Sequence, residues 1–151
     1  AMTDFVVMVE KLGTMFVTGP DVVKTVLGEE VSFDELGGAM THASKSGVAH
    51  FVAENEYDCM DKIKTLLSYI PQNNTEEPPH LSNDDDPNRL DHNLINLIPE
   101  DSLKPYDMKE IILSIVDNNT FFQVHELFAQ NILVGFARFH GKTVGIVANK
   151  P

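Results

Sequence analysis

Residues 36–50 read LGGAMTHASKSGVAH, in which a glycine pair follows a helical turn and a third glycine, Gly47, begins a Gly-Val step. Glycine adopts dihedral angles that are closed to other residues, and it lets the backbone pass close to a ligand or to another segment. A helix C-terminus followed by a tight turn would use the same residues. Local chemistry by itself leaves both interpretations open.

His42 lies between the glycine pair and Ser46. Its imidazole could hydrogen-bond a ligand carboxylate or carbonyl, or it could be a structural histidine that orients the loop. Lys45 could meet a ligand phosphate or be solvated. Position alone favours the structural histidine and the solvated lysine.

The residues before the glycine pair alternate strand and helix signals. Residues 1–9, AMTDFVVMV, are dense in apolar side chains and predict a strand buried on both faces, and a short strand is expected at 15–18. Gly19-Pro20 opens a helix that Gly28 closes. Three valines are expected to form its buried side: Val22, Val23 and Val26. This alternation is typical of an α/β layer.

Two cap patterns flank the glycine pair. Ser32 and Glu35 have the spacing of a capping box, and Asn55 with Asp58 caps a later helix that Pro71 ends. Apolar residues recur in that later helix at helical spacing, and we expect them to be core: Met60, Ile63, Leu66, Leu67 and Ile70.

Residues 72–105 differ from the rest, with five prolines, runs of Asn and Asp, and one short apolar patch at 94–98. Such a composition predicts a linker between two lobes. A third helix then begins with Asp107 and Glu110 in a capping-box pattern, with an apolar side formed by Ile111, Ile112, Ile115 and Val116. Strands are expected at 121–124, 132–139 and 143–148, the last two joined by a turn.

The composition excludes several classes of function. The 151 residues carry a net charge of −12, which argues against binding to nucleic acid or to an anionic membrane. No apolar run reaches the length of a membrane-spanning helix, so direct membrane insertion is not expected. The lone Cys59 permits no internal disulfide and favours the cytoplasm. The six histidines lack metal-ligand spacing, and no metal site is predicted.

Residues 15–56 resemble a family of enzymes. They contain FxTGPxVxK at 16–24 and LGGAxxHxxxSGVAH at 36–50, and the resemblance continues through LLSYIPQNN at 66–74, PYDM at 105–108 and the closing residues 131–151. These motifs are similar to those of the carboxyltransferase subunits of biotin-dependent acyl-CoA carboxylases, decarboxylases and transcarboxylases.

This resemblance implies a crotonase-like α/β fold. Residues 1–71 would be the C-terminal part of the acyl-CoA lobe, 72–105 the inter-lobe linker and 106–151 the start of the biotin lobe. The substrate-binding residues would lie in the glycine stretch: Gly37, Gly38, His42, Ser46 and Gly47. No catalytic residue is expected in this chain.

The implied activity moves a carboxyl group between carboxybiotin and the α-carbon of propionyl-CoA or methylmalonyl-CoA. In the family, two glycine-rich segments supply backbone N–H donors to the oxyanions. They resemble AGGAVYSPA, expected just before residue 1, and FGGAYDVMG, expected well after residue 151. We therefore expect a middle portion of a longer subunit that is inactive by itself.

The resemblance also implies partners. Biotin would be carried on a partner domain, the CoA thioester would be the substrate, and a biotin carboxylase or the membrane subunits of a decarboxylase would act alongside a homo-oligomer. An alternative is a non-catalytic CoA-binding or interaction module on the same scaffold. The length of the gene separates the two.

Overall fold

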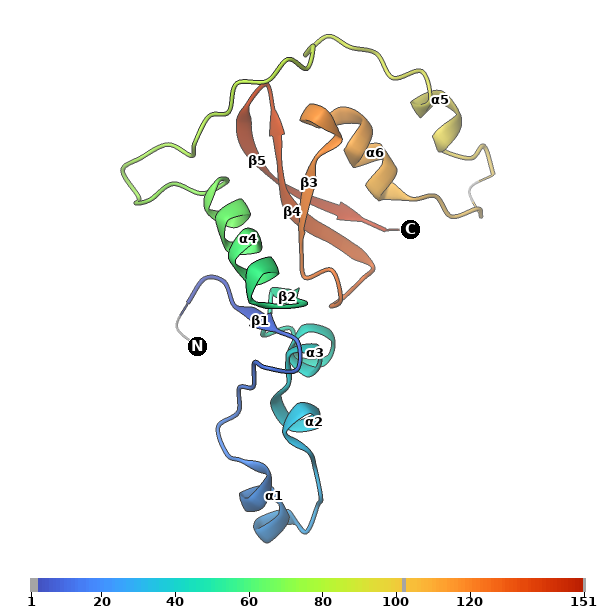
Figure 1. The fold of residues 1–151 in the computed structure, drawn as a ribbon. Coiled ribbons are helices and arrows are strands. Elements are labelled where there is room, and N and C mark those ends of the chain that lie inside the picture. The colour runs from blue at the N-terminus through green and yellow to red at the C-terminus, as the bar shows by residue number, and fades with distance from the viewer. Residues whose placement is uncertain (1–2, 102, 151) are drawn as a thin grey trace. The chain divides into compact units, whose positions relative to one another are not determined.

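Two small sheets, each with its own helices, organise residues 3–101 and 103–150, which the computed structural model describes (Figure 1). Contacts divide the chain into two units. The first extends to Lys64 and includes His125–Ala129, and the second contains Thr65–Val124 and the residues from Gln130 onward.

In the first unit, strands β1 (Val7–Val9) and β2 (Phe51–Ala53) pair in parallel, with Met8 opposite Val52. The strand predicted over 1–9 thus begins at Val7, and its first two residues lie outside the described part of the chain. The strand predicted at 15–18 is wrong. An isolated bridge between Thr14 and Gly38 takes its place, because this segment pairs with the glycine turn over one residue only.

Helix α1 (Pro20–Leu27) begins at the predicted proline and ends at Gly28, whose left-handed φ of 73° caps it. The expected buried side is wrong, since no residue of α1 is buried and Val22 and Val26 are 49% and 73% exposed. Figure 1 shows why: α1 lies at the end of an excursion of the chain away from β1 and β2. Periodicity predicts an apolar face without saying what covers it.

Small residues fill the core of the first unit. Short helices α2 (Phe33–Gly37) and α3 (Ala39–Thr41) lead into the π-helix η1 (His42–Ser46). The core cluster contains Met8 with three alanines, Ala39, Ala43 and Ala49. Because alanine carries a single methyl group, the backbone segments of this unit pack close together.

Helix α4 (Glu56–Leu67) has the predicted cap, since Asn55 Oδ1 accepts from the backbone N–H groups of Tyr57 and Asp58 at 3.0 Å each. Asp58 also pairs with Lys62 at 2.6 Å. The helix ends at Leu67, before the predicted stop at Pro71, and its predicted core stripe is only partly right. Leu66 is buried, whereas Met60 and Leu67 are exposed.

The second unit is a three-stranded antiparallel sheet in the order β3 (Phe121–Val124), β4 (Ile132–Phe139) and β5 (Lys142–Asn149). The first two strands have the predicted bounds, and the third is one residue longer at each end. His140 and Gly141 have φ of 50° and 77°, as a type I′ hairpin turn requires.

Helix α6 (Met108–Ile115) covers one face of this sheet (Figure 1). Ile112 and Val116 are buried with Leu133 and Ala137, so the predicted apolar side is partly right. Ile115 of the same predicted side is 47% exposed. The predicted capping box is wrong in detail, because the Asp107 side chain accepts from Lys109 N at 2.9 Å rather than from Glu110 N.

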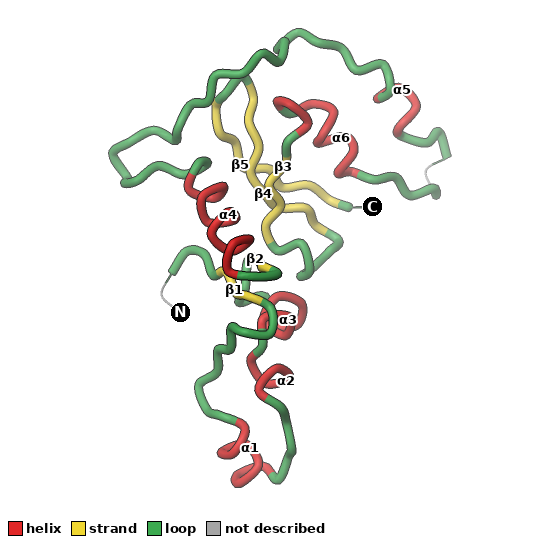
Figure 2. Tube along the Cα trace, in the orientation of Figure 1, coloured by secondary structure: helices red, strands yellow, loops and turns green. Residues whose placement is uncertain are grey.

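The described residues of the predicted linker, 72–101 and 103–105, are loop apart from the short helix α5 (Leu94–Leu97), as Figure 2 shows. The 3₁₀ turn η2 (Asp117–Asn119) separates α6 from β3. In the part of the chain that is described, no helix combines the length and apolar character needed to cross a membrane.

Candidate functional site

The glycine pair is required by close approach of the backbone. A β-carbon at Gly37 would lie 2.3 Å from Met15 O, and one at Gly38 would lie 2.7 Å from Asp34 O. Met15 N donates to Gly37 O at 2.8 Å, which holds the two segments together. Gly38 has φ of −71°, which any residue adopts, so steric space and not dihedral freedom selects glycine there.

Gly47 is selected for both reasons. Its φ of 68° lies in the left-handed region, where it ends the π-helix η1. A β-carbon at Gly47 would also lie 2.8 Å from the ring of Phe128. Single π-helical turns occur frequently at functional sites, which draws attention to this turn.

His42 uses both ring nitrogens inside the chain. Nδ1 lies 2.9 Å from Ser46 Oγ, and Nε2 contacts Met15 O at 2.5 Å. Val48 N also donates to Ser46 Oγ at 3.4 Å, so the two predicted site residues brace the same turn. These contacts match the structural alternative for His42, and substrate binding by His42 and Ser46 stays a prediction.

The capping box predicted at the start of this region is present. Ser32 N donates to Glu35 Oε2 at 2.9 Å, and Glu35 N donates to Ser32 Oγ at 3.2 Å. The backbone hydrogen bond from Ser32 lowers the pKa of the Glu35 carboxyl, and the Ser32 hydroxyl lowers it further. Lys45 is exposed, as the solvated alternative describes.

A cavity of about 170 Å³ borders the glycine pair. It is lined by Glu10, Lys11, Asp34, Gly38, Ala39 and Met40. Complete sites for drug-sized ligands have volumes of about 300–1,000 Å³. The residues around Gly38 therefore form at most one wall of a site for a ligand as large as a nucleotide cofactor.

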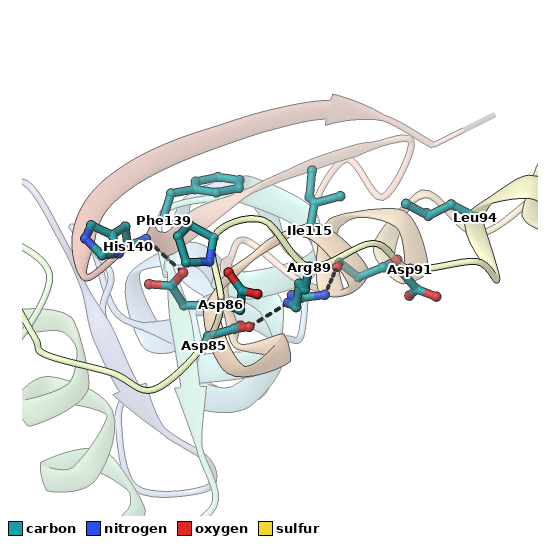
Figure 3. Close-up of a pocket in the computed structure, with 11 residues that line it drawn as sticks. Asp85, Asp86, Arg89, Asp91, Leu94, Ile115, Phe139 and His140 are labelled. Carbon is teal, nitrogen blue, oxygen red and sulfur yellow. Dashed lines mark hydrogen bonds and ion pairs between the residues drawn. The ribbon is translucent and has the colours of Figure 1, made fainter.

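A larger hollow, of about 290 Å³, lies in the second unit, where residues of the linker meet the end of α6 and the β4–β5 turn (Figure 3). We call Asn83–Arg89 the linker clasp. Within it, Arg89 donates to Asp85 Oδ1 at 2.6 Å and to the carbonyls of Ser114 and Val116 at 2.6 and 2.9 Å. Arg89 thereby caps the C-terminal end of α6.

Asp117 ties the same linker clasp to the hairpin. Its carboxylate accepts from His140 N at 2.9 Å, from Gly141 N at 2.7 Å and from Asn83 Nδ2 at 2.5 Å. A backbone hydrogen bond from Asn118 lowers the pKa of Asp85, and Arg89 lowers it further. Sequence reasoning missed these contacts, because no local pattern pairs a linker with a hairpin turn.

The charge of the residues that line this hollow decides which ligands it could bind. Four carboxylates line it: Asp85, Asp86, Asp91 and Asp117. Arg89 is already engaged by Asp85 and two carbonyls, so an anionic phosphate would meet uncompensated negative charge. No group of three or more His, Cys, Asp or Glu side chains in the described ranges is placed to hold a metal ion.

Comparison with known proteins identifies the family. The carboxyl transferase domain matches residues 1–151. The chain belongs to this family. It is 54% identical to the carboxyltransferase subunit of propionyl-CoA carboxylase from Haloferax mediterranei, and the match covers 100% of this chain and 29% of that protein. It is 52% identical to methylmalonyl-CoA decarboxylase subunit alpha from Veillonella parvula, again over 100% of this chain and 30% of that protein.

A solved structure agrees with the sequence matches. Transcarboxylase 12S, a hexamer solved with methylmalonyl-coenzyme A and methylmalonic acid bound, superposes with a TM-score of 0.94 at 44% identity. The alignment covers 99% of this chain and 28% of the transcarboxylase chain. The fold of this carboxyl transferase chain is therefore crotonase-like, as the motifs predicted. The chain spans less than a third of the length of these relatives.

Proposed function

We propose that this chain is part of a biotin-dependent carboxyltransferase acting on a short-chain acyl-CoA, with propionyl-CoA or methylmalonyl-CoA as the substrate. One observation carries the proposal: the whole described fold superposes on transcarboxylase 12S, which was solved with methylmalonyl-coenzyme A bound. In the overall reaction, the carboxyl group leaves N1 of carboxybiotin and bonds to the α-carbon, while the α-proton passes to the ureido nitrogen.

In this proposal the glycine stretch supports the acyl-CoA site. Gly38 lines a cavity, and Gly37 and Gly47 allow Met15 and Phe128 to pack against the backbone where a side chain would clash. His42 and Ser46 hold the turn between them. We assign these five residues to substrate binding and no residue of the chain to a catalytic step.

The lobe arrangement belongs to the same proposal. Residues 1–71 would complete the acyl-CoA lobe, 72–105 would be the linker and 106–151 would begin the biotin lobe. The cavities at Gly38 and the linker clasp do not by themselves fit biotin, because the first is small and the second is lined by carboxylates. We therefore derive no step through biotin from these residues.

Partners follow from the reaction. A carrier domain would present biotin, and either a biotin carboxylase or the membrane subunits of a decarboxylase would complete the cycle. Relatives named as biotin-dependent carboxylase subunits and a hexameric transcarboxylase support this assignment and a homo-oligomer.

The test uses the complete product of the gene that encodes this chain. The protein should transfer labelled carboxylate from methylmalonyl-CoA to free biotin. Malonyl-CoA and a long-chain α-carboxyacyl-CoA, tested as donors in the same assay, bracket the substrate class. Binding of CoA without transfer from any of these donors would instead support a non-catalytic module. The 151-residue chain assayed alone is the matched comparison and should show no transfer.

A further inference from the structure

Two histidine rings far apart in sequence lie against each other in the first unit, with their planes tilted. The ring centroids of His50 and His125 are 4.4 Å apart, and the planes are inclined by 38°. His125 N also donates to His50 O at 3.1 Å. The loop that joins β3 to β4 therefore contacts the end of the glycine stretch through both backbone and side chain.

Phe128 makes a second contact between the same two segments. Its ring occupies the space where a β-carbon of Gly47 would lie, 2.8 Å from the nearest ring atom. Phe128 N donates to His125 O at 3.0 Å, which closes the loop into a turn. The ring of Phe128 also lies 6.0 Å from that of His125. The turn at Gly47 is thus bordered by two aromatic groups of one loop.

The loop adopts a backbone that its residues disfavour. His125 and Ala129 have φ of 55° and 48°, in the left-handed region. Such dihedrals are unfavourable for non-glycine residues and persist where surrounding contacts fix them. The contacts with Gly47 and His50 supply that constraint.

The surroundings of the His50 ring favour its neutral form. Its Nδ1 accepts from Val6 N at 3.2 Å, so a proton on Nδ1 would replace a hydrogen bond by two opposed N–H groups. Burial lowers the pKa of His50, and the neighbouring His125 lowers it further, while a backbone hydrogen bond with Val48 opposes them. The other ring against His50 is the uncharged Phe5, at 5.3 Å.

We propose that the loop His125–Ala129 is a positioning element that holds the turn Ser46–His50 in the geometry for acyl-CoA. His125 and Phe128 act through Gly47 and His50 and do not touch substrate. The role in substrate binding rests on the proposed function above. The packing of the loop on the turn is independent of it, and the test separates the two.

The first arm measures hydrogen exchange of the amides of residues 46–50 in the 151-residue chain. Phe128→Ala and His125→Ala should speed exchange about tenfold, because each removes a contact that closes the turn. Phe128→Leu and His125→Phe retain an apolar side chain or a ring and should restore protection to a large extent. His92→Gln, at an exposed histidine of the linker, is the control and should change nothing.

Folding is monitored by the amide signals of β4 and β5 in the other unit, which should stay unchanged in every variant. If exchange at 46–50 stays within about twofold of wild type in both alanine variants, the positioning role is wrong. If an alanine variant instead loses the β4 and β5 signals, the conservative variants Phe128→Leu and His125→Phe decide. Protection of the amides of residues 46–50 equal to that of wild type supports the positioning role. Loss of that protection, with the signals of β4 and β5 intact, contradicts it.

The second arm measures kinetics in the complete carboxyltransferase. Phe128→Ala should raise KM for the acyl-CoA about fivefold with kcat nearly unchanged, because the turn would be misplaced while the reacting groups stay intact. An unchanged KM contradicts the inference. Absence of transfer in wild type would refute the proposed function alone, since the exchange arm still decides whether the loop positions the turn.

Discussion

Alanines and glycines fill the core of the first unit, whereas branched aliphatic side chains fill that of the second. Ala39, Ala43 and Ala49 are buried beside Met8, and backbone atoms lie where side chains at the glycine pair would be. In the second unit, Ile112, Val116 and Leu133 pack between α6 and the sheet. The first core has little room for larger side chains. The second core should lose more stability when its side chains are shortened.

This difference has a steric cause. Small residues let two backbone segments approach closely, as Gly37 does with Met15 and Gly38 with Asp34. A sheet covered by a helix is stabilised in proportion to the apolar area that it buries. The two regions should therefore respond in opposite ways to truncation and to enlargement of side chains.

Truncation in the second core should have the largest effect. Ile112→Ala should lower the free energy of unfolding by about 2–5 kcal/mol, because it removes buried methylene groups and leaves a cavity. Ile115→Ala on the same helix is the matched control, since Ile115 is 47% exposed, and should cost less than about 1 kcal/mol. Urea unfolding followed through the signals of β4 measures both, and equal losses would contradict the assignment of the core.

The second-largest loss of stability is expected when a side chain is added at the glycine pair of the first unit. Gly37→Ala places a methyl group 2.3 Å from Met15 O, and overpacking of this kind costs about 1–3 kcal/mol. Gly145→Ala is the control, because nothing lies within 4 Å of its added β-carbon. The control should be neutral or more stable by up to about 1 kcal/mol, as expected for glycine within a strand. Thermal melting of both variants checks the comparison, which fails if they behave alike.

Enlargement at the second glycine should reduce activity. In the complete carboxyltransferase, Gly38→Val should slow carboxyl transfer about tenfold, because the side chain would collide with the backbone of Asp34 and displace the turn. Gly145→Val is the matched control. Transfer rates are compared only after circular dichroism shows both variants folded. A rate within about twofold of wild type would remove the turn from the site.

Parts of the linker should differ in their resistance to proteolysis. Limited digestion with subtilisin should cut first within 72–79 or 92–104, since the linker clasp between them is bonded to the end of α6 through Arg89 and to Asp117 through Asn83. Arg89→Ala removes both bonds to the end of α6 and the bond to Asp85, and it should speed cleavage within 83–91 about threefold to tenfold.

Lys104→Ala is the control for the linker, because Lys104 is an exposed cation of the same segment. Mass spectrometry of the earliest fragments locates the cuts. First cuts inside the linker clasp of wild type would show that its hydrogen bonds do not protect it.

The smallest expected effect is a difference in acid sensitivity between the turn at residues 46–50 and the linker clasp. The pKa of His50 is lowered from its ordinary 6.5, so the stability that the neutral ring contributes is complete above pH 6.5 and is lost as pH falls through the lower folded value. The pKa of Asp85 is lowered from 3.8, so its contribution is complete above pH 3.8 and is lost only below that.

At pH 5, the amides of residues 46–50 should therefore exchange about twofold to fivefold faster than at pH 7.5, after correction for the intrinsic rate, while those of the linker clasp stay unchanged. Hydrogen exchange resolved by residue measures both regions in one sample. The same change in both regions would mean that neither His50 nor Asp85 controls its own region.

Local signals in the sequence predicted many of the elements. Pro20 and Gly28 bound α1, Ser32 with Glu35 caps α2, and alternating apolar residues gave the bounds of β3 and β4. These signals succeed because capping and strand alternation depend on neighbours within a few residues. The motif at 36–50 also predicted the family, through its resemblance to the motif of carboxyltransferase subunits.

Burial was predicted less well. Val22 and Val26 of α1 and two residues of the α4 stripe are exposed, although their spacing is that of a core face. Periodicity states which residues share a face, and a contact with another element decides whether that face is covered. The candidate site shows the same limit. The glycine pair was found from sequence, but the reason for Gly38 is the position of Asp34, and the preference for a positive dihedral proved wrong.

The sequence alone determined the α/β class, the family and the place of the glycine stretch, because these depend on residue type and on spacing along the chain. Only the tertiary structure decided which distant residues meet that stretch. His125 and Phe128 lie beside Gly47 and His50, and Arg89 lies at the end of α6. Such contacts join residues that no local pattern relates, because the path of the chain through space sets them.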